Sequence, residues 1–561
     1  MTSRNLALAS AALLALCSSP ALRQTKKIAA TESSARRNAV AETSDPILRA
    51  MLSELDRSKG RLKMENVAAP YYIEYRLSDE DEYSSEAAFG ALRQQQRNHS
   101  RSIRVVVRVG GYKQDSYYNQ GTGFANVAPT DDAAIPLERQ LWLATDIAYK
   151  RASEALASKK AVLSQYTADQ PFDDFAHAPQ VSSIDPLVKL ELDPKPWNSA
   201  LEKATTLFRT DPKIQSLAAS FGARAVNQYF VNTEGTVTRR GYTVFILNLS
   251  GSTQADDGMK LERSPYYSSA VLSEMPNEER LLADTHKMLD TLKALREAPV
   301  VEEEYRGPVL FSSDAADDVF AVLIGNNVLG KRPKPGASAR TEGPFASSYK
   351  SRVLPNFVSI VDDPSVKALD GRTLIGSYDT DDEGVRAVAV PVVENGELAN
   401  YLLGREPIRD FPESNGHGRA GPAQPPAPTI GNLIVKSKQA VSFAELKQQL
   451  IELCHKESKP YGYFVDTLGP GLSPRLLYRI YEKDGHEEIV RGGVFSELDT
   501  RTLRNDLIAM GNDPLVSNRE GVIPSTIIAP SILFDELEVK RTDAKNAKLP
   551  EYPSPPLPGA P

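Results

Sequence analysis

Residues 229–249 read YFVNTEGTVTRRGYTVFILNL, and this stretch indicates how the first half of the chain folds. Residues 229–231 and 237–249 are rich in β-branched and aromatic side chains, which favour strands. Residues 232–235, Asn-Thr-Glu-Gly, are typical turn formers. The stretch therefore predicts a strand, a turn and a second, longer strand.

Helix and strand patterns continue on both sides of this hairpin and divide the chain into two blocks. In residues 45–300, apolar spacing predicts helices at 45–58, 137–152, 197–208 and 277–297, and strands at 71–77 and 102–109. Residues 305–545 contain mostly strand patterns, including an Asn-Gly hairpin at 392–398 and a second hairpin at 478–490. A helix begins at Ser313, and another begins at Ser442 with a capping box to Glu445. We predict an α+β fold, in which a mixed N-terminal α/β domain (45–300) precedes a strand-rich, barrel-like antiparallel C-terminal domain (305–545).

Composition excludes several classes of protein. The chain has 561 residues, with 41% hydrophobic and 25% charged residues, so collagen-like, wholly disordered and multi-span membrane proteins are excluded. Its 66 Lys and Arg against 73 Asp and Glu argue against a nucleic-acid partner. Two Cys cannot build a disulfide framework, and six His limit any metal site.

The two ends of the chain differ from the rest. Residues 1–21 have one charge (Arg4), an apolar run of eleven residues and a small-residue site at 19–21, the pattern of a secretory signal peptide. The run is too short to span a bilayer. We expect an exported protein, periplasmic or secreted, with lipidation at Cys17 as the alternative to simple cleavage. Residues 22–44 are expected to be a flexible leader, and residues 546–561 a proline-rich tail.

No generic catalytic motif is present in the sequence. No two histidines lie within five positions of each other. Cys454 follows Leu450 by one helical turn and is expected to be a core thiol, whereas His486 is expected at a solvated strand end. The acidic run at 379–383, DTDDE, could collect a cation, but a charged surface loop is the commoner explanation of such a run.

Several ordered stretches resemble the TldD/PmbA (TldE) family, also called modulator-of-gyrase or U62 peptidases. They lie at residues 232–235, 307–311, 381–384, 393–398, 414–419, 427–432, 510–513 and 532–539. In that family, TldD-type metallopeptidase subunits pair with metal-free TldE/PmbA-type subunits, and peptides enter an enclosed cleft. The resemblance implies cleft residues Asp381, Asp382, Glu383, Asn415 and Arg419 here.

The resemblance also locates the metal site. TldD-type subunits carry a helical H-E-x-x-x-H and a distant Cys, and the helix must widen for histidines five apart to converge on zinc. The corresponding positions here are Ala321, Val322 and Asn326, with Ser517 at the Cys position. A methyl, an amide and a hydroxyl cannot hold Zn²⁺ without thiolate or imidazole. We therefore predict no cofactor and no catalytic residue in this chain, and we expect the helix, Val322 included, to be packed.

Three functions remain open at the level of the sequence. The favoured one is a metal-free TldE/PmbA-type subunit that holds unfolded peptide, in a dimer whose TldD-like partner has an intact H-E-x-x-x-H and carries the zinc. The second is a stand-alone peptide-binding or scaffold protein with no peptidase link. The third is an autonomous hydrolase that would use the acids at 379–383 with a hard cation; no nucleophile or base is positioned for it.

Overall fold

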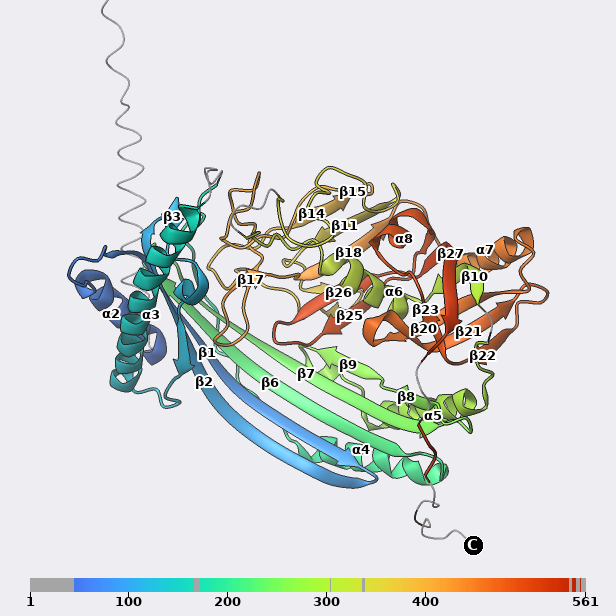
Figure 1. The fold of residues 1–561 in the computed structure, drawn as a ribbon. Coiled ribbons are helices and arrows are strands. Elements are labelled where there is room, and N and C mark those ends of the chain that lie inside the picture. The colour runs from blue at the N-terminus through green and yellow to red at the C-terminus, as the bar shows by residue number, and fades with distance from the viewer. Residues whose placement is uncertain are drawn as a thin grey trace, which may run out of the picture.

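The computed structural model describes residues 45–165, 172–302, 304–334, 339–543, 547–550 and 555. The predicted signal peptide (1–21), the leader (22–44) and most of the predicted tail (546–561) lie outside these residues. Figure 1 shows two strand-rich blocks with helices on their outer faces and between their sheets, so the predicted α+β fold is confirmed. Within the described ranges no helix has both the length and the apolar character needed to cross a bilayer.

A curved sheet forms the framework of the first block (Figure 1). Its long strands are two antiparallel hairpins, β1–β2 and β6–β7, joined through the pairing of β1 with β6. The order is β3-β2-β1-β6-β7-β5, with β4 on β2 and with β8 and β9 on β7. The strands are β1 (Pro70–Ala88), β2 (Ala91–Gly111), β3 (Gln114–Asp115), β4 (Phe124–Val127), β5 (Ser182–Ile184), β6 (Ser216–Asn232), β7 (Val237–Gln254), β8 (Lys260–Arg263) and β9 (Tyr266–Ser269).

Strands β1 and β2 are much longer than the sequence patterns predicted. The polar and acidic residues 78–88 pair along their whole length with β2 on one side and β6 on the other. Phe89 and Gly90 form the turn between the two strands with φ of 53° and 81°, the positive values that tight hairpins need. The extension has no recognisable strand pattern, because polar residues occupy both faces and hide the alternation.

The two faces of the curved sheet have different partners. Successive side chains of a strand point to opposite faces. Tyr75 and its neighbours on one face pack against α2 and α3, and farther along the same face Phe221 packs in a core with α4 and α5. The concave face, which carries Arg76, faces the C-terminal block (Figure 1). The helices are α2 (Pro46–Arg61), α3 (Ala134–Leu163), α4 (Lys195–Thr206) and α5 (Glu278–Glu297).

The C-terminal block consists of two sheets with a helix between them. The eight-stranded sheet has the order β19-β24-β27-β10-β20-β21-β22, with β23 on β27, and the six-stranded sheet has the order β15-β14-β11-β18-β26-β25. The first contains β10 (Tyr305–Phe311), β19 (Ala440–Val441), β20 (Tyr461–Gly469), β21 (Ser473–Tyr481), β22 (Glu487–Val490), β23 (Gly493–Phe495), β24 (Leu507–Gly511) and β27 (Ile532–Arg541). The second contains β11 (Val358–Asp362), β14 (Val390–Glu394), β15 (Glu397–Leu398), β18 (Asn432–Ser437), β25 (Leu515–Arg519) and β26 (Ser525–Ala529).

The remaining elements of this block are short strands and three helices. Two small hairpins lie outside the large sheets: β12 (Ala368–Leu369) with β13 (Arg372–Thr373), and β16 (Gly418–Arg419) with β17 (Ala427–Pro428). Helix α6 (Ser313–Phe320) shares one core with both large sheets, whereas α7 (Phe443–Lys456) packs on the outside of the eight-stranded sheet and α8 (Thr500–Asn505) lies beside β24.

The C-terminal block is strand-rich as predicted, but its sheets stay open. In the described part of the chain neither sheet closes on itself, so the expected barrel-like form is corrected to two open sheets around α6. Most pairings are antiparallel; β10–β20, β18–β26 and β19–β24 are parallel. Parallel neighbours need crossover connections rather than tight turns, and the local patterns in the sequence do not report them.

Local signals predicted several details correctly. Asn395 and Gly396 form the expected tight turn with positive φ. Ser442 and Glu445 form the complete capping box of α7. Cys454 is fully buried on α7, and burial raises the pKa of its thiol to about 12, as expected of a core thiol.

Candidate functional site

Helix α6 continues into a π-helical turn, Ala321–Gly325. The Asn326 N–H donates to the Ala321 carbonyl at 3.2 Å, a bond between residues five apart. A π-turn therefore widens the helix at the positions where the resemblance predicts the family's metal motif. It also brings positions 321 and 326 toward one face.

The π-turn has one exposed side and one buried side. Val322 is 42% exposed and Asn326 is also exposed, whereas Leu323 and Ile324 belong to the core between the two sheets. The expectation that Val322 is packed is therefore wrong. The wider turn changes the rotation from one residue to the next. As a result, the residues after Val322, and not Val322 itself, contact the core.

Ser517 lies on β25, directly beside α6. Its hydroxyl is close enough to Asp317, one turn before Ala321, to favour the ionised form of that carboxyl. The Arg519 guanidinium contacts Asp317 and also Asp318, at 2.7 Å. Burial raises the pKa of Asp317 to about 7, against the opposing effect of Arg519 and Ser517.

Zinc does not fit this arrangement. Ala321, Asn326 and Ser517 supply a methyl, an amide and a hydroxyl, which are poor ligands for Zn²⁺. The two nearby carboxylates already accept from Arg519. In the ranges that the structure describes, no group of three or more His, Cys, Asp or Glu side chains is arranged to hold a metal ion. We therefore derive no chemical step through a metal in this chain.

The acidic segment at 379–383 is not a surface loop beyond its first residue. Asp381, Asp382 and Glu383 are buried, so the surface-loop explanation is wrong for them. Asp381 accepts from the backbone N–H groups of Glu383, Val385 and Gly418 at 2.8–3.0 Å. The carboxylate oxygens of Asp381 thus already accept hydrogen bonds from the protein backbone. These bonds make the segment a structural junction.

The three acids have different electrostatic environments. Burial and the neighbouring Glu383 raise the pKa of Asp381 well above its usual value. Burial also raises the pKa of Glu383, against the backbone N–H and charge of Arg405. Burial opposes ionisation of Asp382 too, but two guanidinium groups outweigh it and lower its pKa; they belong to Arg240 at 2.7 Å and Arg419 at 3.3 Å.

The other two predicted cleft residues also lie in this junction. Arg419 is buried, with its guanidinium 4.0 Å from the centre of the Tyr378 ring. Asn415 accepts from the Leu403 N–H and donates to the Tyr401 carbonyl, both at 2.8 Å. The structure therefore brings Asp382 and Arg419 together, whereas Asn415 holds a neighbouring loop.

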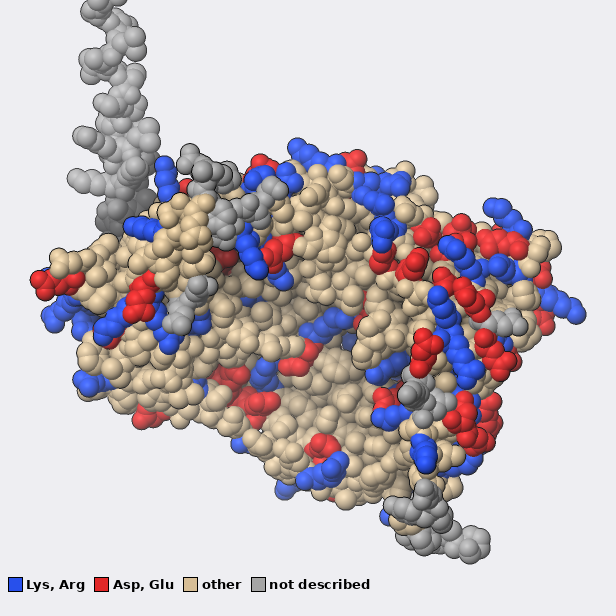
Figure 2. Space-filling model, in the orientation of Figure 1, with Lys and Arg blue, Asp and Glu red and all other residues tan. Residues whose placement is uncertain are grey.

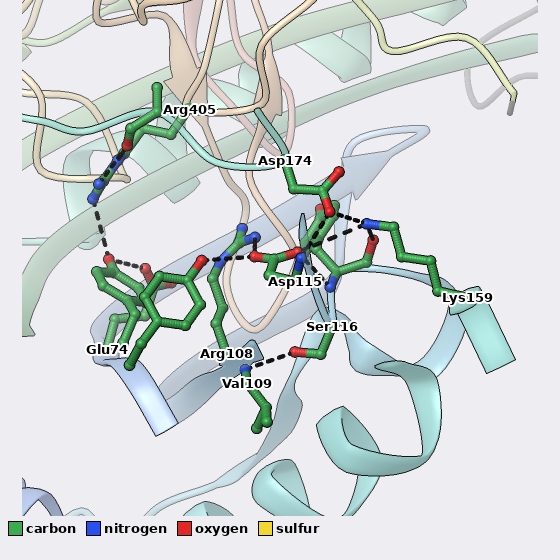
Figure 3. Close-up of polar contacts among 12 residues, drawn as sticks. Glu74, Arg108, Val109, Asp115, Ser116, Lys159, Asp174 and Arg405 are labelled. Carbon is green, nitrogen blue, oxygen red and sulfur yellow. Dashed lines mark hydrogen bonds and ion pairs between the residues drawn. The ribbon is translucent and has the colours of Figure 1, made fainter. Parts of the chain in front are cut away.

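Arg405 joins the two blocks, and no local pattern around it indicates this contact. The side chain is fully buried, and its guanidinium lies 3.9 Å from the centre of the Phe175 ring. It donates two hydrogen bonds to Glu234, at 2.7 and 2.8 Å, and two to the Ala176 carbonyl, at 3.0 and 2.6 Å. Figure 3 shows Arg405 reaching down to a tyrosine hydroxyl that in turn bonds Glu74; the tyrosine is Tyr72.

A second buried ionic cluster lies beside this contact (Figure 3). Arg108 pairs with Asp115 at 2.7 Å, and Lys159 of α3 pairs with Asp174 at 2.5 Å. Arg332 of the C-terminal block reaches the same Asp174 at 2.8 Å. Together with Arg405, this cluster fixes the C-terminal block over the concave face of the first sheet.

A cavity of about 50 Å³ lies between the concave sheet and the C-terminal loops. Strands β1, β2, β6 and β7 line one side, and residues 379–382 and 420–423 line the other. In Figure 2 the surface is hollowed where the C-terminal block overhangs the sheet, and acidic and basic side chains gather there. Asp381 and Asp382 of the predicted cleft line this cavity.

Comparison with known proteins identifies the type of the C-terminal domain. Residues 304–541 match the model of the PmbA/TldA metallopeptidase C-terminal domain. These residues therefore form a C-terminal domain of the PmbA/TldD type. A curated metalloprotease of Methanocaldococcus jannaschii is 24% identical over 244 residues, which are 43% of this chain and 51% of that protein. The aligned region thus spans about half the length of this relative.

Solved structures show that the TldD/PmbA fold extends over most of the chain. TldE from Thermococcus kodakarensis is 12% identical, with a TM-score of 0.60 over 88% of this chain and 100% of that chain. A proposed modulator of DNA gyrase from Bacteroides thetaiotaomicron is 14% identical, with a TM-score of 0.58 over 88% and 98%. A second one, from Thermotoga maritima, is 17% identical, with a TM-score of 0.55 over 83% and 96%.

Proposed function

We propose that this chain is an exported, metal-free TldE/PmbA-type subunit of a metallopeptidase complex that acts on unfolded peptides. In this proposal it forms part of the peptide cleft, and a TldD-like partner with an intact H-E-x-x-x-H binds zinc and cuts. The PmbA/TldA-type C-terminal domain and the curated metalloprotease relative support the peptidase context.

The observation that carries the proposal is the exposed face of the π-turn. The backbone keeps the widened turn that an H-E-x-x-x-H site needs, and Val322 and Asn326 remain open to solvent. No side chain at positions 321, 322, 326 or 517 can bind zinc or activate water. A face that is accessible but chemically inert suits a subunit that contacts peptide without cutting it.

The strand beside this face suggests how peptide is held. β25 is the last strand of the six-stranded sheet and pairs only with β26 among the described strands. An extended peptide can add to such an edge through main-chain hydrogen bonds, which do not depend on side-chain identity. Unfolded peptides of varied sequence are therefore the expected ligands.

The export part of the proposal rests on residues 1–21. Fractionation of cells that express the full chain should find the protein outside the cytoplasm and shortened at its N-terminus. A variant without residues 1–21 should stay in the cytoplasm. Equal distribution of the two forms would contradict export.

Reconstitution tests the role in a complex. The full chain is expressed with a candidate TldD-type partner from the same organism, and cleavage of an unfolded, fluorogenic peptide is measured for each protein alone and for the mixture. We expect the two chains to co-purify, and we expect the mixture to cleave in a chelator-sensitive manner. Peptide binding by this chain, with no co-purification and no cleavage in the mixture, would support the stand-alone alternative and contradict the role in a complex.

A further inference from the structure

Two rows of mainly polar side chains cross the concave face of the curved sheet. They follow from the strand register, because residues opposite one another on neighbouring strands share a face. The first row places the two arginines of β2 and β1 directly opposite each other. The rows are Arg104–Arg76–Phe230–Thr238 and Ser102–Ser78–Gln228–Arg240.

These rows form the floor of the cavity under residues 379–382 and 420–423. The volume of about 50 Å³ is several times what one water molecule needs. A carboxylate group at the end of a longer ligand fits such a space.

One arginine of the floor has no ion-pair partner among the described residues. Arg240 is paired with Asp382 at 2.7 Å, and Arg76 lies 3.7 Å from Glu74. Arg104 is buried, and no described carboxylate lies within ion-pair distance of it. Burial, and then the charge of Arg76, lower the pKa of Arg104 to about 10, which is the effect expected of a buried cation beside a like charge.

The two opposed arginines also have unused donors. The Nε–H groups of Arg76 and Arg104 are buried without a described acceptor. Arg104 gives its other hydrogen bonds to the carbonyls of Ala423, at 3.1 Å, and Thr122. The neutral carbonyls satisfy these terminal N–H groups of Arg104, but they do not balance the charge of its guanidinium.

The loop over the cavity is itself held by this pair. Arg76 donates to the Gln424 carbonyl, next to the bond from Arg104 to Ala423. Ala423 has a φ of +57°, a left-handed conformation that is costly for a residue with a Cβ. Strained backbone of this kind persists only where its surroundings impose it, and it is common at ligand clamps.

We propose that the Arg76–Arg104 cavity binds one carboxylate group of a bound peptide. The inference rests on the proposed peptide-binding function and adds a substrate preference to it. An arginine without an ion-pair partner suits a monoanionic carboxylate, and the two opposed guanidinium groups offer donors to both of its oxygens. The carboxylate comes either from the C-terminus of the peptide or from an acidic side chain.

Fluorescence anisotropy with the purified full chain distinguishes these sources. The probes are three forms of one fluorescein-labelled Ser/Gly/Ala octapeptide: a free acid, a C-terminal amide, and an amide with one central Glu. We expect at least one carboxylate form to bind about 10-fold or more tightly than the plain amide, because a charge-assisted hydrogen bond is lost with the carboxylate. Equal affinity for all three forms would overturn the inference and leave peptide binding intact.

Variants connect the preference to the cavity. Arg104→Gln should abolish the difference between the carboxylate and amide forms, whereas Arg93→Gln, an exposed arginine on the same strand, should preserve it. If Arg104→Gln does not fold, the isosteric Gln228→Glu tests the same floor, because a built-in carboxylate should compete with the ligand. Retention of the full preference in a folded Arg104→Gln or Gln228→Glu protein would overturn the assignment.

Sodium acetate tests the cavity without any peptide. At constant ionic strength, replacing chloride with acetate should raise the melting temperature of the wild type and of Arg93→Gln but not that of Arg104→Gln. If acetate raises the melting temperature in this way but none of the peptides binds, the carboxylate site is supported and the proposed peptide function is contradicted. No difference between acetate and chloride in the wild type would overturn the inference.

Discussion

Replacing Arg405 with Met should weaken the connection between the two blocks. The side chain is fully buried and gives two hydrogen bonds to Glu234 and two to the Ala176 carbonyl. Arg405→Met leaves the carboxylate of Glu234, only 17% exposed, without its cation. Removing one partner of a buried pair costs about 3–5 kcal/mol, a large part of the roughly 5–15 kcal/mol by which folded proteins are stable.

Urea denaturation measures this effect with two probes. Both tryptophans, Trp142 and Trp197, lie in the first block, so their fluorescence reports on that block, whereas circular dichroism reports on the whole chain. With a slope of about 3 kcal/mol per molar urea, the midpoint should fall by about 1–2 M. The two probes should then separate, because the blocks no longer unfold together.

Two control variants test whether Arg405 couples the two blocks. Arg306→Met removes an ion pair with Glu536 in which the arginine is 65% exposed, and it should leave the midpoint unchanged. The double variant Arg405→Met/Glu234→Gln should recover part of the loss, because no charge is left buried alone. An Arg405→Met protein with the wild-type midpoint and coincident probes would show that Arg405 does not couple the blocks.

Three further predictions concern the π-turn and the buried acids. Val322→Glu should change the free energy of unfolding by no more than about 0.5 kcal/mol, whereas Ile324→Ala should cost about 2–5 kcal/mol in the same thermal melt; a reversed order would contradict the exposure of this turn. Burial raises the pKa of Glu406 to about 7 from its ordinary 4.5, so the folded state keeps a proton that the unfolded state releases, and stability should fall as pH rises from about 4.5 to 7. Melting temperatures of Glu406→Gln should decline less over that range, and parallel curves would refute the shift. Gly418→Ala should destabilise the fold by about 1–3 kcal/mol, because its Cβ would lie 2.1 Å from a carboxylate oxygen of Glu383; an unchanged melt would contradict that close packing.

Sequence reasoning succeeded where the signal is local. Residues within a few positions determine the helix start at Asn277, the capping box at Ser442 and the turn at Asn395. The helix that begins at Ser313 was also expected from its local pattern, whereas the π-turn at its end was not predicted for this chain. The burial of Val322 was predicted wrongly because a regular helical period does not hold within a π-turn.

Contacts between distant residues were beyond the sequence patterns. Glu234 and Arg405 are 171 positions apart, and nothing in either local stretch indicates that they meet. The acids at 381–383 appeared to be a solvated loop, because their composition does not show the arginines and backbone N–H groups that bury them. The arginine pair of the proposed carboxylate site depends in the same way on the register between β1 and β2.

The central claim is that this chain contacts peptide but has no catalytic metal of its own. The most direct test is to measure zinc content and cleavage of an unfolded peptide for the purified full chain, after dialysis against zinc-containing buffer. We predict less than about 0.1 zinc per chain and no chelator-sensitive cleavage, because positions 321, 326 and 517 offer no imidazole or thiolate. One zinc per chain with cleavage that a chelator abolishes would contradict the account.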